Sequence, residues 1–410
     1  MSFQTGLSGL NASAKNLDVI GNNIANANTV GSKVSRTEFA AVVASAIGPS
    51  GGGGAAGEGI GVEVSTVSQQ FSQGTINITG NNLDCAINGG GFFELTLPDG
   101  SSAYTRDGKF KLDSKGNLIT NSGASVMGYA ITNGVPSSTP TKMSVPSGAP
   151  IAAKATTTIN ASFNLDARAT TYDPLTNTPP GTTYGTTLNA FDSQGVTVPV
   201  KLFFTKNTAA NTWDVWDNDP NPTAVPAATN LGQLVFDTTG ILTSPAPATL
   251  PMTLTPGNAG AATPMTVSLD VSGATQYGTS FAISDLTQDG YTAGTLTGIS
   301  ISEQGIITTR YSNGQTQSNG QLALADFRNV QGLKPIGQNN WAETSSSGQP
   351  LHGHPAQGNF GSINSGALEA SNIDLTAELV AMMTAQRDYQ ANAQTNKTQD
   401  TVMQTLVNLR

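Results

Sequence analysis

The sequence predicts a fold of the α+β class that is mainly β. Terminal α-helices forming a coiled coil would flank two nested β-rich domains, the second inserted in the first. Apolar residues recur every seven positions at both ends of the chain, which is the spacing of a coiled-coil helix. Between the ends, short alternating runs are broken by turn dipeptides, a pattern typical of strands. One long segment within that β region has a composition of its own, which predicts the insertion.

Residues 1–35 form the N-terminal half of the predicted helical domain. Two rows recur at a strict seven-residue spacing: Phe3, Leu10, Leu17 and Ile24, and then Leu7, Ala14 and Gly21. Gly6, Gly9 and Gly21 would each weaken an isolated helix by about 1 kcal/mol relative to alanine. The helix therefore needs a partner for its apolar stripe.

Residues 371–410 form the C-terminal half of this domain, and they contain no glycine or proline. One heptad row holds Leu375, Met382, Tyr389, the polar Asn396 and Met403, and the other holds Leu379, Gln386, Ala393, Asp400 and Val407. Leu406 broadens the stripe near the end. The natural partner of each terminal stripe is the other end of the chain or the ends of other copies.

The segments 36–70 and 356–370 connect the helices to a middle β domain, predicted over 71–145 and 285–355. Its turn signals are Asp107-Gly108, Lys115-Gly116, Gln304-Gly305 and Asn313-Gly314. Such glycine-containing dipeptides between alternating runs predict hairpins.

Residues 146–284 are predicted to be an outer β domain inserted into the middle one. The window 151–300 holds 31 of the 53 threonines, and no glutamate occurs between Glu94 and Glu303. This change of composition marks a segment that folds by itself.

Composition excludes several function classes. The net charge of −9 argues against a nucleic-acid partner, which would require a basic footprint. No run of 18 apolar residues exists, so we expect no membrane insertion. The N-terminus lacks the basic and apolar regions of a secretory signal peptide. Cys85, the single cysteine, lies in an apolar run and is expected in a buried strand.

The sequence contains no convergent catalytic or metal-binding set. His352 and His354 have no third ligand nearby, and a surface loop explains them better than a metal site. A calcium loop around Asp214 and Asp217 would need a glycine at the sixth position, where Pro222 stands. We therefore expect no enzyme activity, no cofactor and no metal.

Several stretches identify a family. The segment LSGLNASAKNLDVIGNNIANANTVGSK near the N-terminus and GALEASNIDLTAELVAMMTAQRDYQANAQTNKTQDTVMQTLVNLR at the C-terminus resemble the rod/hook family of bacterial flagellar axial proteins. FSQGTINITGNNLDCAINGGGFFEL matches a shared β element, and the stretch from Ile299 to Gly348 is similar to hook members. The resemblance covers 1–45, 60–130 and 295–410 and is weak over 146–284. Ser32 stands where the family usually has an aromatic residue.

The resemblance implies a structural subunit of the flagellar hook. Copies would polymerise into a flexible hollow tube that works as a universal joint and passes motor torque from rod to filament. The helices would line the channel, and the insertion would form the outer surface. A distal-rod subunit of the same family is the alternative, because the two differ mainly in rigidity and position. A secreted β-rich adhesin fits the terminal heptads less well.

The resemblance also implies the partners and the location. Besides other copies of itself, these are the distal rod protein, the hook cap protein, the hook–filament junction protein and the flagellar type III export gate. The protein would be extracellular, in the hook of the flagellar basal body, and exported without a cleaved signal peptide. The export-gate segment would be Phe39, Ala40, Ala41, Val42 and Val43, although local packing explains it equally well. The polymerisation seam would comprise Phe3, Leu7, Leu10, Leu17, Ile24, Leu375, Leu379, Met382, Tyr389, Met403, Leu406 and Val407.

Overall fold

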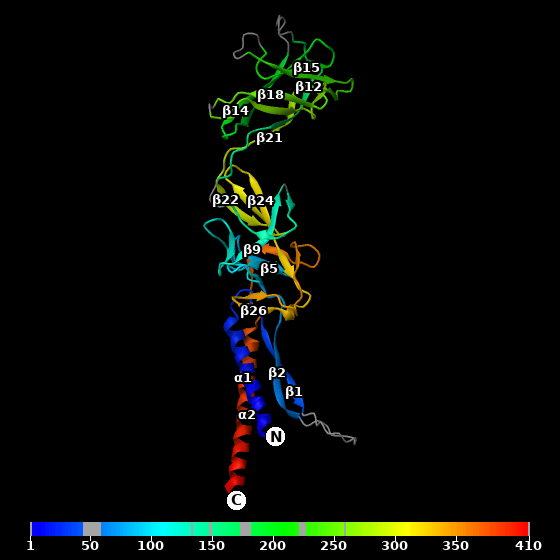
Figure 1. Ribbon diagram of the computed structural model, residues 1–410. Coiled ribbons are helices and arrows are strands. Elements are labelled where there is room, and N and C mark those ends of the chain that lie inside the picture. The colour runs from blue at the N-terminus through cyan, green and yellow to red at the C-terminus, as the bar shows by residue number, and fades with distance from the viewer. Residues whose placement is uncertain are drawn as a thin grey trace. The chain divides into compact units, whose positions relative to one another are not determined.

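The computed structural model describes residues 2–43, 59–132, 134–146, 150–172, 182–220, 227–257 and 260–408. The chain forms two compact units. Unit 1 comprises 1–148, 298–310 and 316–410, and unit 2 comprises 149–297 and 311–315. The described fold is mainly β with one long helix at each end, so the predicted fold class is confirmed (Figure 1).

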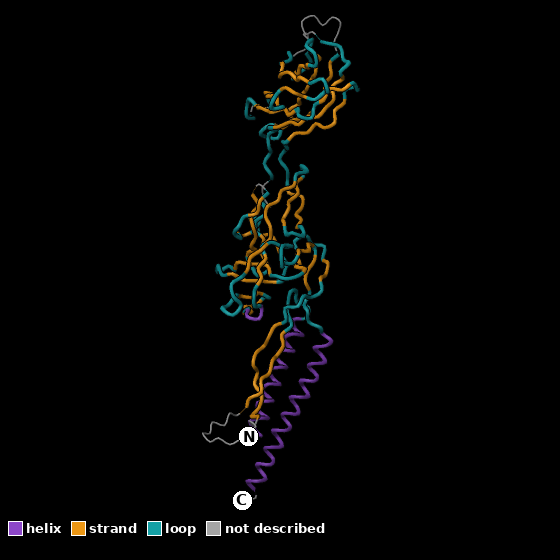
Figure 2. The backbone as a smooth tube through the Cα atoms, turned by 90° about the vertical axis from the view of Figure 1, so that its right-hand side faces the viewer, coloured by secondary structure: helices purple, strands orange, loops and turns teal. Residues whose placement is uncertain are grey.

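The two helices of unit 1 are α1 (Ser2–Asn26) and α2 (Leu375–Asn408). They lie side by side in both views (Figures 1 and 2). Asp374 caps α2, because its Oδ1 accepts hydrogen bonds from the amides of Thr376 (2.9 Å) and Ala377 (3.2 Å). Such a cap satisfies amides that the first helical turn leaves without partners.

A long antiparallel hairpin, β1 (Ser35–Val43) and β2 (Gly59–Gln69), follows α1. The hairpin packs on α1 at Gly61, where a side chain would overlap Ser8. The Ser8 hydroxyl accepts a hydrogen bond from the amide of Val62 at 3.2 Å. Glycine is therefore required at the point where the strand crosses the helix.

The β part of unit 1 is built on one large sheet with the strand order β22-β23-β24-β9-β5-β6-β27-β26. The strands of unit 1 that precede the insertion are β3 (Ile76–Ile78), β4 (Cys85–Asn88), β5 (Phe92–Thr96), β6 (Ser102–Thr105), β7 (Phe110–Leu112), β8 (Leu118–Thr120), β9 (Ser125–Thr132), β10 (Val135–Pro136) and β11 (Thr141–Lys142). After the insertion come β22 (Leu296–Ile301), β23 (Ile306–Tyr311), β24 (Thr316–Leu322), β25 (Leu324–Asp326), η1 (Val330–Gly332), β26 (Lys334–Gly337), β27 (Asn340–Ala342), β28 (Leu351–Gly353), β29 (Ser362–Ser365) and β30 (Ala367–Glu369). Two of the latest strands return to early ones, since β29 pairs with β4 and β30 with β3.

Three of the four predicted hairpin turns are confirmed. Gly116, Gly305 and Gly314 adopt positive φ angles of 83°, 72° and 80° between paired strands. The hairpin at Asp107-Gly108 is wrong, because β6 pairs with β5 and β27 while β7 pairs with β8. Gly108 instead lets the backbone pass directly against the carbonyl of Cys85.

Two apolar clusters hold unit 1 together. One contains Cys85, which is fully buried in β4 as expected, and burial raises the pKa of its thiol to about 12. The other is aromatic, and edge-to-face contacts join Phe92 to Phe71, Phe327 and Trp341 at centroid distances of 5.6–6.1 Å. The second cluster lies next to the end of β2, because Trp341 Nε1 donates a hydrogen bond to Gln69 Oε1 at 2.7 Å.

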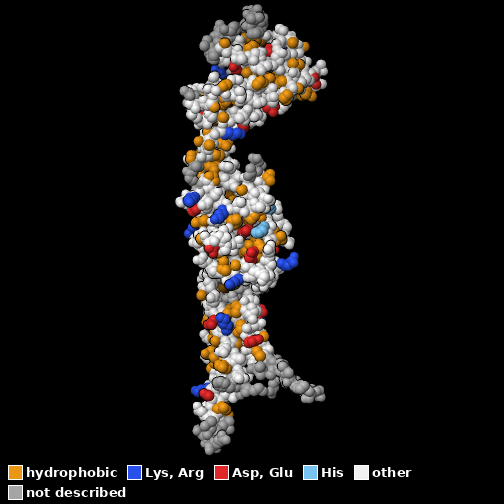
Figure 3. Space-filling model, in the orientation of Figure 1, with side chains coloured by type: hydrophobic (Ala, Val, Ile, Leu, Met, Phe, Trp, Pro, Cys, Tyr) orange, Lys and Arg blue, Asp and Glu red, His pale blue; other side chains and the backbone are white. Residues whose placement is uncertain are grey.

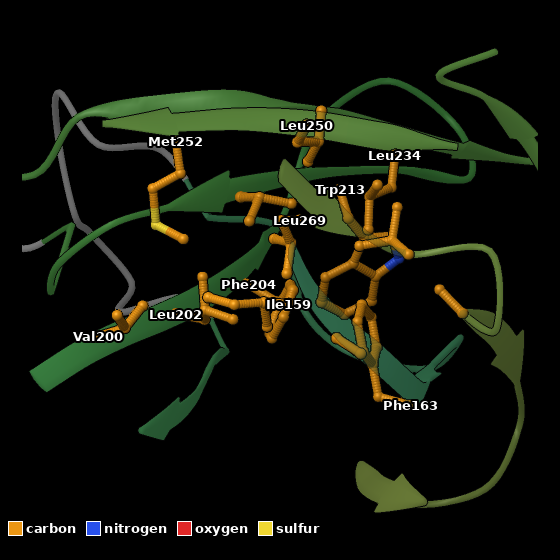
Figure 4. Packing of buried hydrophobic residues seen from close by; sticks show 14 of the residues in the cluster. Ile159, Phe163, Val200, Leu202, Phe204, Trp213, Leu234, Leu250, Met252 and Leu269 are labelled. Carbon is orange, nitrogen blue, oxygen red and sulfur yellow. The ribbon is translucent and has the colours of Figure 1, made fainter. Parts of the chain in front are cut away.

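Unit 2 is a sandwich of two sheets. One contains β18-β19-β12-β20 with β21 paired to β12, and the other has the order β13-β14-β15-β16-β17. The strands are β12 (Thr158–Asp166), β13 (Thr183–Phe191), β14 (Thr197–Lys206), β15 (Thr212–Trp216), β16 (Asn230–Phe236), β17 (Leu242–Ser244), β18 (Thr249–Leu254), β19 (Met265–Asp270), β20 (Thr275–Tyr277) and β21 (Ala282–Gln288). Trp213, Phe163 and Leu269 meet in the core between the sheets (Figure 4).

Unit 2 extends beyond the segment 146–284 expected from composition. Strand β21 pairs with β12 as far as Gln288. The Asp289 carboxylate then joins the segment after β21 to the start of β12 and the residues before it, because it accepts hydrogen bonds from the amides of Thr157 (2.8 Å) and Thr158 (2.9 Å) and from Lys154 Nζ (2.9 Å). Residues up to 297 therefore belong to this unit.

The hydrogen bonds to the Asp289 carboxylate predict that the stability of unit 2 depends on pH. Burial alone would raise the pKa of Asp289, but the hydrogen bonds from Thr158, Thr157 and Lys154 outweigh it and hold the pKa well below its ordinary value. Because the folded-state pKa is depressed, this stabilisation is complete above about pH 4 and is lost as the pH falls further. Asp289→Asn should therefore unfold more easily than the wild type at pH 7, with a difference that shrinks on acidification.

Chemical denaturation monitored by tryptophan fluorescence between pH 7 and pH 3 would measure this. Asp285→Asn is the matched control, because Asp285 is exposed on β21, the strand that ends just before Asp289. A difference in stability between wild type and Asp289→Asn that stays constant or grows below pH 4 would contradict this role of Asp289.

Candidate assembly surface

The contact between α1 and α2 is antiparallel and is made by small and polar residues. Gly6 lies against Asn396, and Gly9 lies against Asn392. Ala12 and Ala385 are buried, with 6% and 3% of their surface exposed. The two helices therefore approach closely at these positions, where glycine and alanine leave room for the asparagine side chains.

Most of the predicted apolar rows lie outside this contact. Leu7, Leu375, Leu379, Tyr389 and Met403 are exposed, between 37% and 62%. Leu10, Leu17, Ile24 and Met382 are half-buried. The side chains of Phe3, Leu406 and Val407 lie outside the described residues. Apolar side chains accordingly reach the surface along the helical part of unit 1 (Figure 3).

The residues of the helix contact form heptad rows of their own. On α1 the contact includes Gly6 and Ser13, which are seven residues apart, and Gly9, and on α2 it includes Ala385 and Asn392, which are also seven residues apart, and Asn396. On α1 this surface lies about a third of a turn away from the apolar rows. Sequence reasoning placed Asn396 in an apolar row as its polar member and missed the other contact residues, because it followed large apolar side chains. The signal was the same seven-residue spacing in glycine, alanine and asparagine.

A buried cluster of three charges ties both chain ends to the β part of unit 1. The carboxylate of Glu369 lies 2.6 Å from Lys33 Nζ and 3.2 Å from Arg106 Nη1. It also accepts a hydrogen bond from the amide of Gly74 at 3.0 Å. All three charged side chains are buried, so water competes little for these contacts.

Each cation of this cluster has further partners. Lys33 Nζ donates to the carbonyl of Ser72 at 2.7 Å, and Arg106 Nη2 donates to that of Gly89 at 2.9 Å. The Arg106 guanidinium also lies over the Phe92 ring, 5.3 Å from its centroid. Burial lowers the pKa values of both Lys33 and Arg106, although the Glu369 carboxylate opposes this shift. The carboxylate is therefore the group that makes two buried cations tolerable.

Two asparagines complete the junction. Asn372, just before α2, accepts from the amide of Val34 (2.8 Å) and donates to the carbonyl of Gln70 (2.9 Å). Asn23 near the end of α1 donates to the carbonyl of Ser35 and accepts from its amide at 2.8 and 3.0 Å. The starts of β1 and α2 are thereby fixed to each other.

The expected export segment lies on β1. Phe39 is exposed at 47%, and it lines a groove of about 500 Å³ together with Val62, Ala12 and Ala385. Ala40, Ala41 and Val42 pair with β2 in the described hairpin, and the side chain of Val43 lies outside the described residues. The structure thus places the segment in a strand beside the helix pair.

The histidines are placed within unit 1. His352 Nδ1 lies 3.0 Å from Glu94 Oε2, and the His354 ring packs on Tyr129 at 4.3 Å. Burial raises the pKa of Glu94, although His352 opposes the shift. Within the part of the chain that is described, no group of three residues is arranged to hold a metal. In the calcium-loop segment weighed from the sequence, Asp214 accepts hydrogen bonds from the side-chain amides of Asn207 and Gln233 at 2.7 and 2.9 Å, and Pro222 lies outside the described residues.

Among the described residues, no helix combines the length and the hydropathy needed to cross a bilayer.

Four family models match the chain in succession. Residues 3–33 match the flagella basal body rod protein family, and residues 86–166 match the D1 domain of flagellar hook protein FlgE/F/G. Residues 164–291 match the D2 domain of flagellar basal body protein FlaE, and 364–409 match the C-terminal family of flagellar basal body rod FlgEFG proteins. The third match corrects the weak resemblance found over 146–284, because the inserted segment also has a counterpart in the family.

Whole relatives match along the full chain. It is 42% identical to flagellar hook protein FlgE of Escherichia coli K12, 40% identical to that of Salmonella typhimurium and 34% identical to that of Rhizobium meliloti. The alignments cover 100% of this chain and 98–100% of each relative. The crystal structure of Helicobacter pylori flagellar hook protein FlgE2 shares the fold, with a TM-score of 0.52 at 16% identity over 72% of this chain and 100% of that chain.

The buried charge cluster gives a sharp prediction. Glu369→Gln should destabilise unit 1 by about 3–5 kcal/mol, because it leaves Lys33 and Arg106 buried without a counter-charge. Native-state hydrogen exchange of the β4 and β5 amides would measure the loss. Glu303→Gln is the control, since Glu303 is exposed and should change stability by less than about 0.5 kcal/mol. Equal exchange rates in the two variants would contradict the role given to Glu369.

Proposed function

Because this chain belongs to the flagellar hook protein family and is a structural subunit of the hook, we propose that its copies polymerise into a flexible hollow tube. This tube passes motor torque from the rod to the filament as a universal joint. The observation that supports the proposal best is the exposure of Leu7, Leu375, Leu379 and Met403 on a helix pair whose own contact uses other residues. Apolar rows of this kind need a partner outside the chain.

The energetics favour other copies as that partner. Burying one leucine side chain contributes about 1.5–3 kcal/mol, and a helix pair presents several such side chains to each neighbour. The seam consists of the described Leu7, Leu10, Leu17, Ile24, Leu375, Leu379, Met382, Tyr389 and Met403, with Phe3, Leu406 and Val407 continuing it. Repetition of this contact builds a stiff, continuous inner layer.

The threonine-rich unit 2 suits a different kind of contact. On β13, Thr183, Thr187 and Asn189 are exposed and alternate with partly buried neighbours. Contacts between such polar surfaces are weak and hydrated. They would let neighbouring copies change their spacing at little cost while the hook bends.

The remaining partners follow from the position of a hook subunit. They are the distal rod protein, the hook cap protein, the hook–filament junction protein and the type III export gate, which would recognise the segment Phe39–Val43 during export. The mature protein would lie outside the cell in the hook of the basal body. We assign the chain no catalytic step.

Deletion of the gene tests the function directly. Electron microscopy of isolated basal bodies should show complete rods that end without a hook. Truncated rods would place the chain in the distal rod instead. Normal hooks and filaments would overturn the proposal.

A charge in the seam should block polymerisation. Leu379→Asp and Leu17→Asp would each bury an unpaired carboxylate between copies. A loss of about 3 kcal/mol per contact corresponds to a rise of at least a hundredfold in the concentration needed for assembly. Sedimentation of the purified chain measures this, and circular dichroism checks that the β units stay folded. Gln394→Asp, at an exposed position of α2, is the control, and assembly of Leu379→Asp at the control's concentration would contradict the seam.

Apolar substitutions on unit 2 should stiffen the hook. Thr183→Leu with Thr187→Leu would add about 1 kcal/mol of apolar burial at each contact they make. We expect straighter hooks with smaller curvature fluctuations in electron micrographs and slower swimming. Thr183→Ser with Thr187→Ser preserves polarity and serves as the control. Normal curvature and swimming of the leucine variant would rule out the weak-contact account.

A further inference from the structure

We propose that Asn392 and Asn396 of α2 set the register of the helix pair by seating over Gly9 and Gly6 of α1. The proposal concerns the contact within one chain and is separate from the apolar seam between copies. Only its consequence for hook assembly rests on the proposed function.

The fit at the two glycines is tight. A methyl group on Gly6 would overlap the Oδ1 atom of Asn396. A methyl group on Gly9 would lie 2.9 Å from Asn392 Oδ1, which is closer than side-chain atoms normally approach. In an antiparallel pair, asparagines four residues apart on α2 meet glycines three residues apart on α1, so each amide lies against one glycine.

The polar atoms at this contact are withdrawn from water. Asn392 Nδ2 donates to the hydroxyl of Ser13 at 3.2 Å. Asn396 Oδ1 is buried and has no hydrogen-bond partner within the described residues. Buried asparagines in helix pairs cost stability but select one alignment, because other alignments leave the amide less well placed.

Sliding the helices by one heptad would fill the glycine slot with a large side chain. The residues seven positions from Asn396 on α2 are Tyr389 and Met403. Neither the Tyr389 ring nor the Met403 thioether fits against Gly6, where even a methyl group on the glycine overlaps the facing asparagine. The apolar rows lack this selectivity, because Leu10, Leu17 and Ile24 are nearly equivalent after a shift of seven.

Gly21 supplies a matched control on the same helix. A methyl group there would have no neighbour within 4 Å. Alanine is a better helix former than glycine at positions 6, 9 and 21 alike. A loss of register in Gly6→Ala, but not in Gly21→Ala, would therefore come from the contact with Asn396 and not from helix propensity.

Spin-label distances in the full chain test the proposal. Cysteines at the exposed positions Lys15 and Gln390 would carry the labels, since native Cys85 is fully buried. Labelled chains are measured as monomers, and in hooks diluted with unlabelled chains. Wild type and Gly21→Ala should give one narrow distance. Gly6→Ala and the double variant Asn392→Leu/Asn396→Leu should give a broadened or displaced distance distribution, because the alignment that seats the asparagines over the glycines is no longer preferred.

A compensating variant keeps the test decisive if Gly6→Ala does not assemble. Asn396→Ala makes room for a methyl group at Gly6, so Gly6→Ala/Asn396→Ala should regain the single distance and the hooks. The proposal would be overturned if Gly6→Ala and Asn392→Leu/Asn396→Leu both kept the single wild-type distance. It would also be overturned if Gly6→Ala/Asn396→Ala gave the same distance distribution as Gly6→Ala. Failure of the proposed function would look different, because hooks would then persist without the gene.

Discussion

The burial of one carboxylate between two cations is the interaction on which unit 1 depends. Glu369 comes just before α2, Lys33 comes shortly after α1, and Arg106 belongs to the β part. Removing Glu369 would leave two cations without a counter-charge in a place that water does not reach, at a cost of several kcal/mol. The chain ends are therefore held at the β part of unit 1 by electrostatics, while Asn372 and Asn23 set the local path of the backbone.

From this junction the helices run as a pair with two different surfaces. Glycine, alanine and asparagine face inward and let the backbones approach closely. Leucine and methionine remain exposed on the described parts of both helices. This division separates two tasks, because the inner contact orients the pair within one chain while the outer rows are free to contact other copies. A single leucine-rich seam could not do both.

The sequence predicted the fold class, the two helices and most turns, because heptads and glycine-containing dipeptides are local signals. It did not predict the Glu369 cluster, whose members Lys33 and Glu369 are 336 positions apart. From the sequence, Gly6 and Gly9 were expected only to weaken the N-terminal helix, although the structure places them where the two helices approach each other closely. Asp107-Gly108 had the form of a turn, but Gly108 is needed for passage past Cys85. In each case the decisive neighbour is distant in the sequence.

The central claim is that the outer rows of the helix pair join copies while the glycine–asparagine contact stays within each chain. A cryo-electron microscopy reconstruction of the assembled hook, at a resolution that shows side chains, tests it most directly. The account predicts Leu7, Leu375 and Leu379 buried against neighbouring copies, with Asn396 still over Gly6 of its own chain. Leucines facing the open channel, or Asn396 seated on another copy, would contradict it.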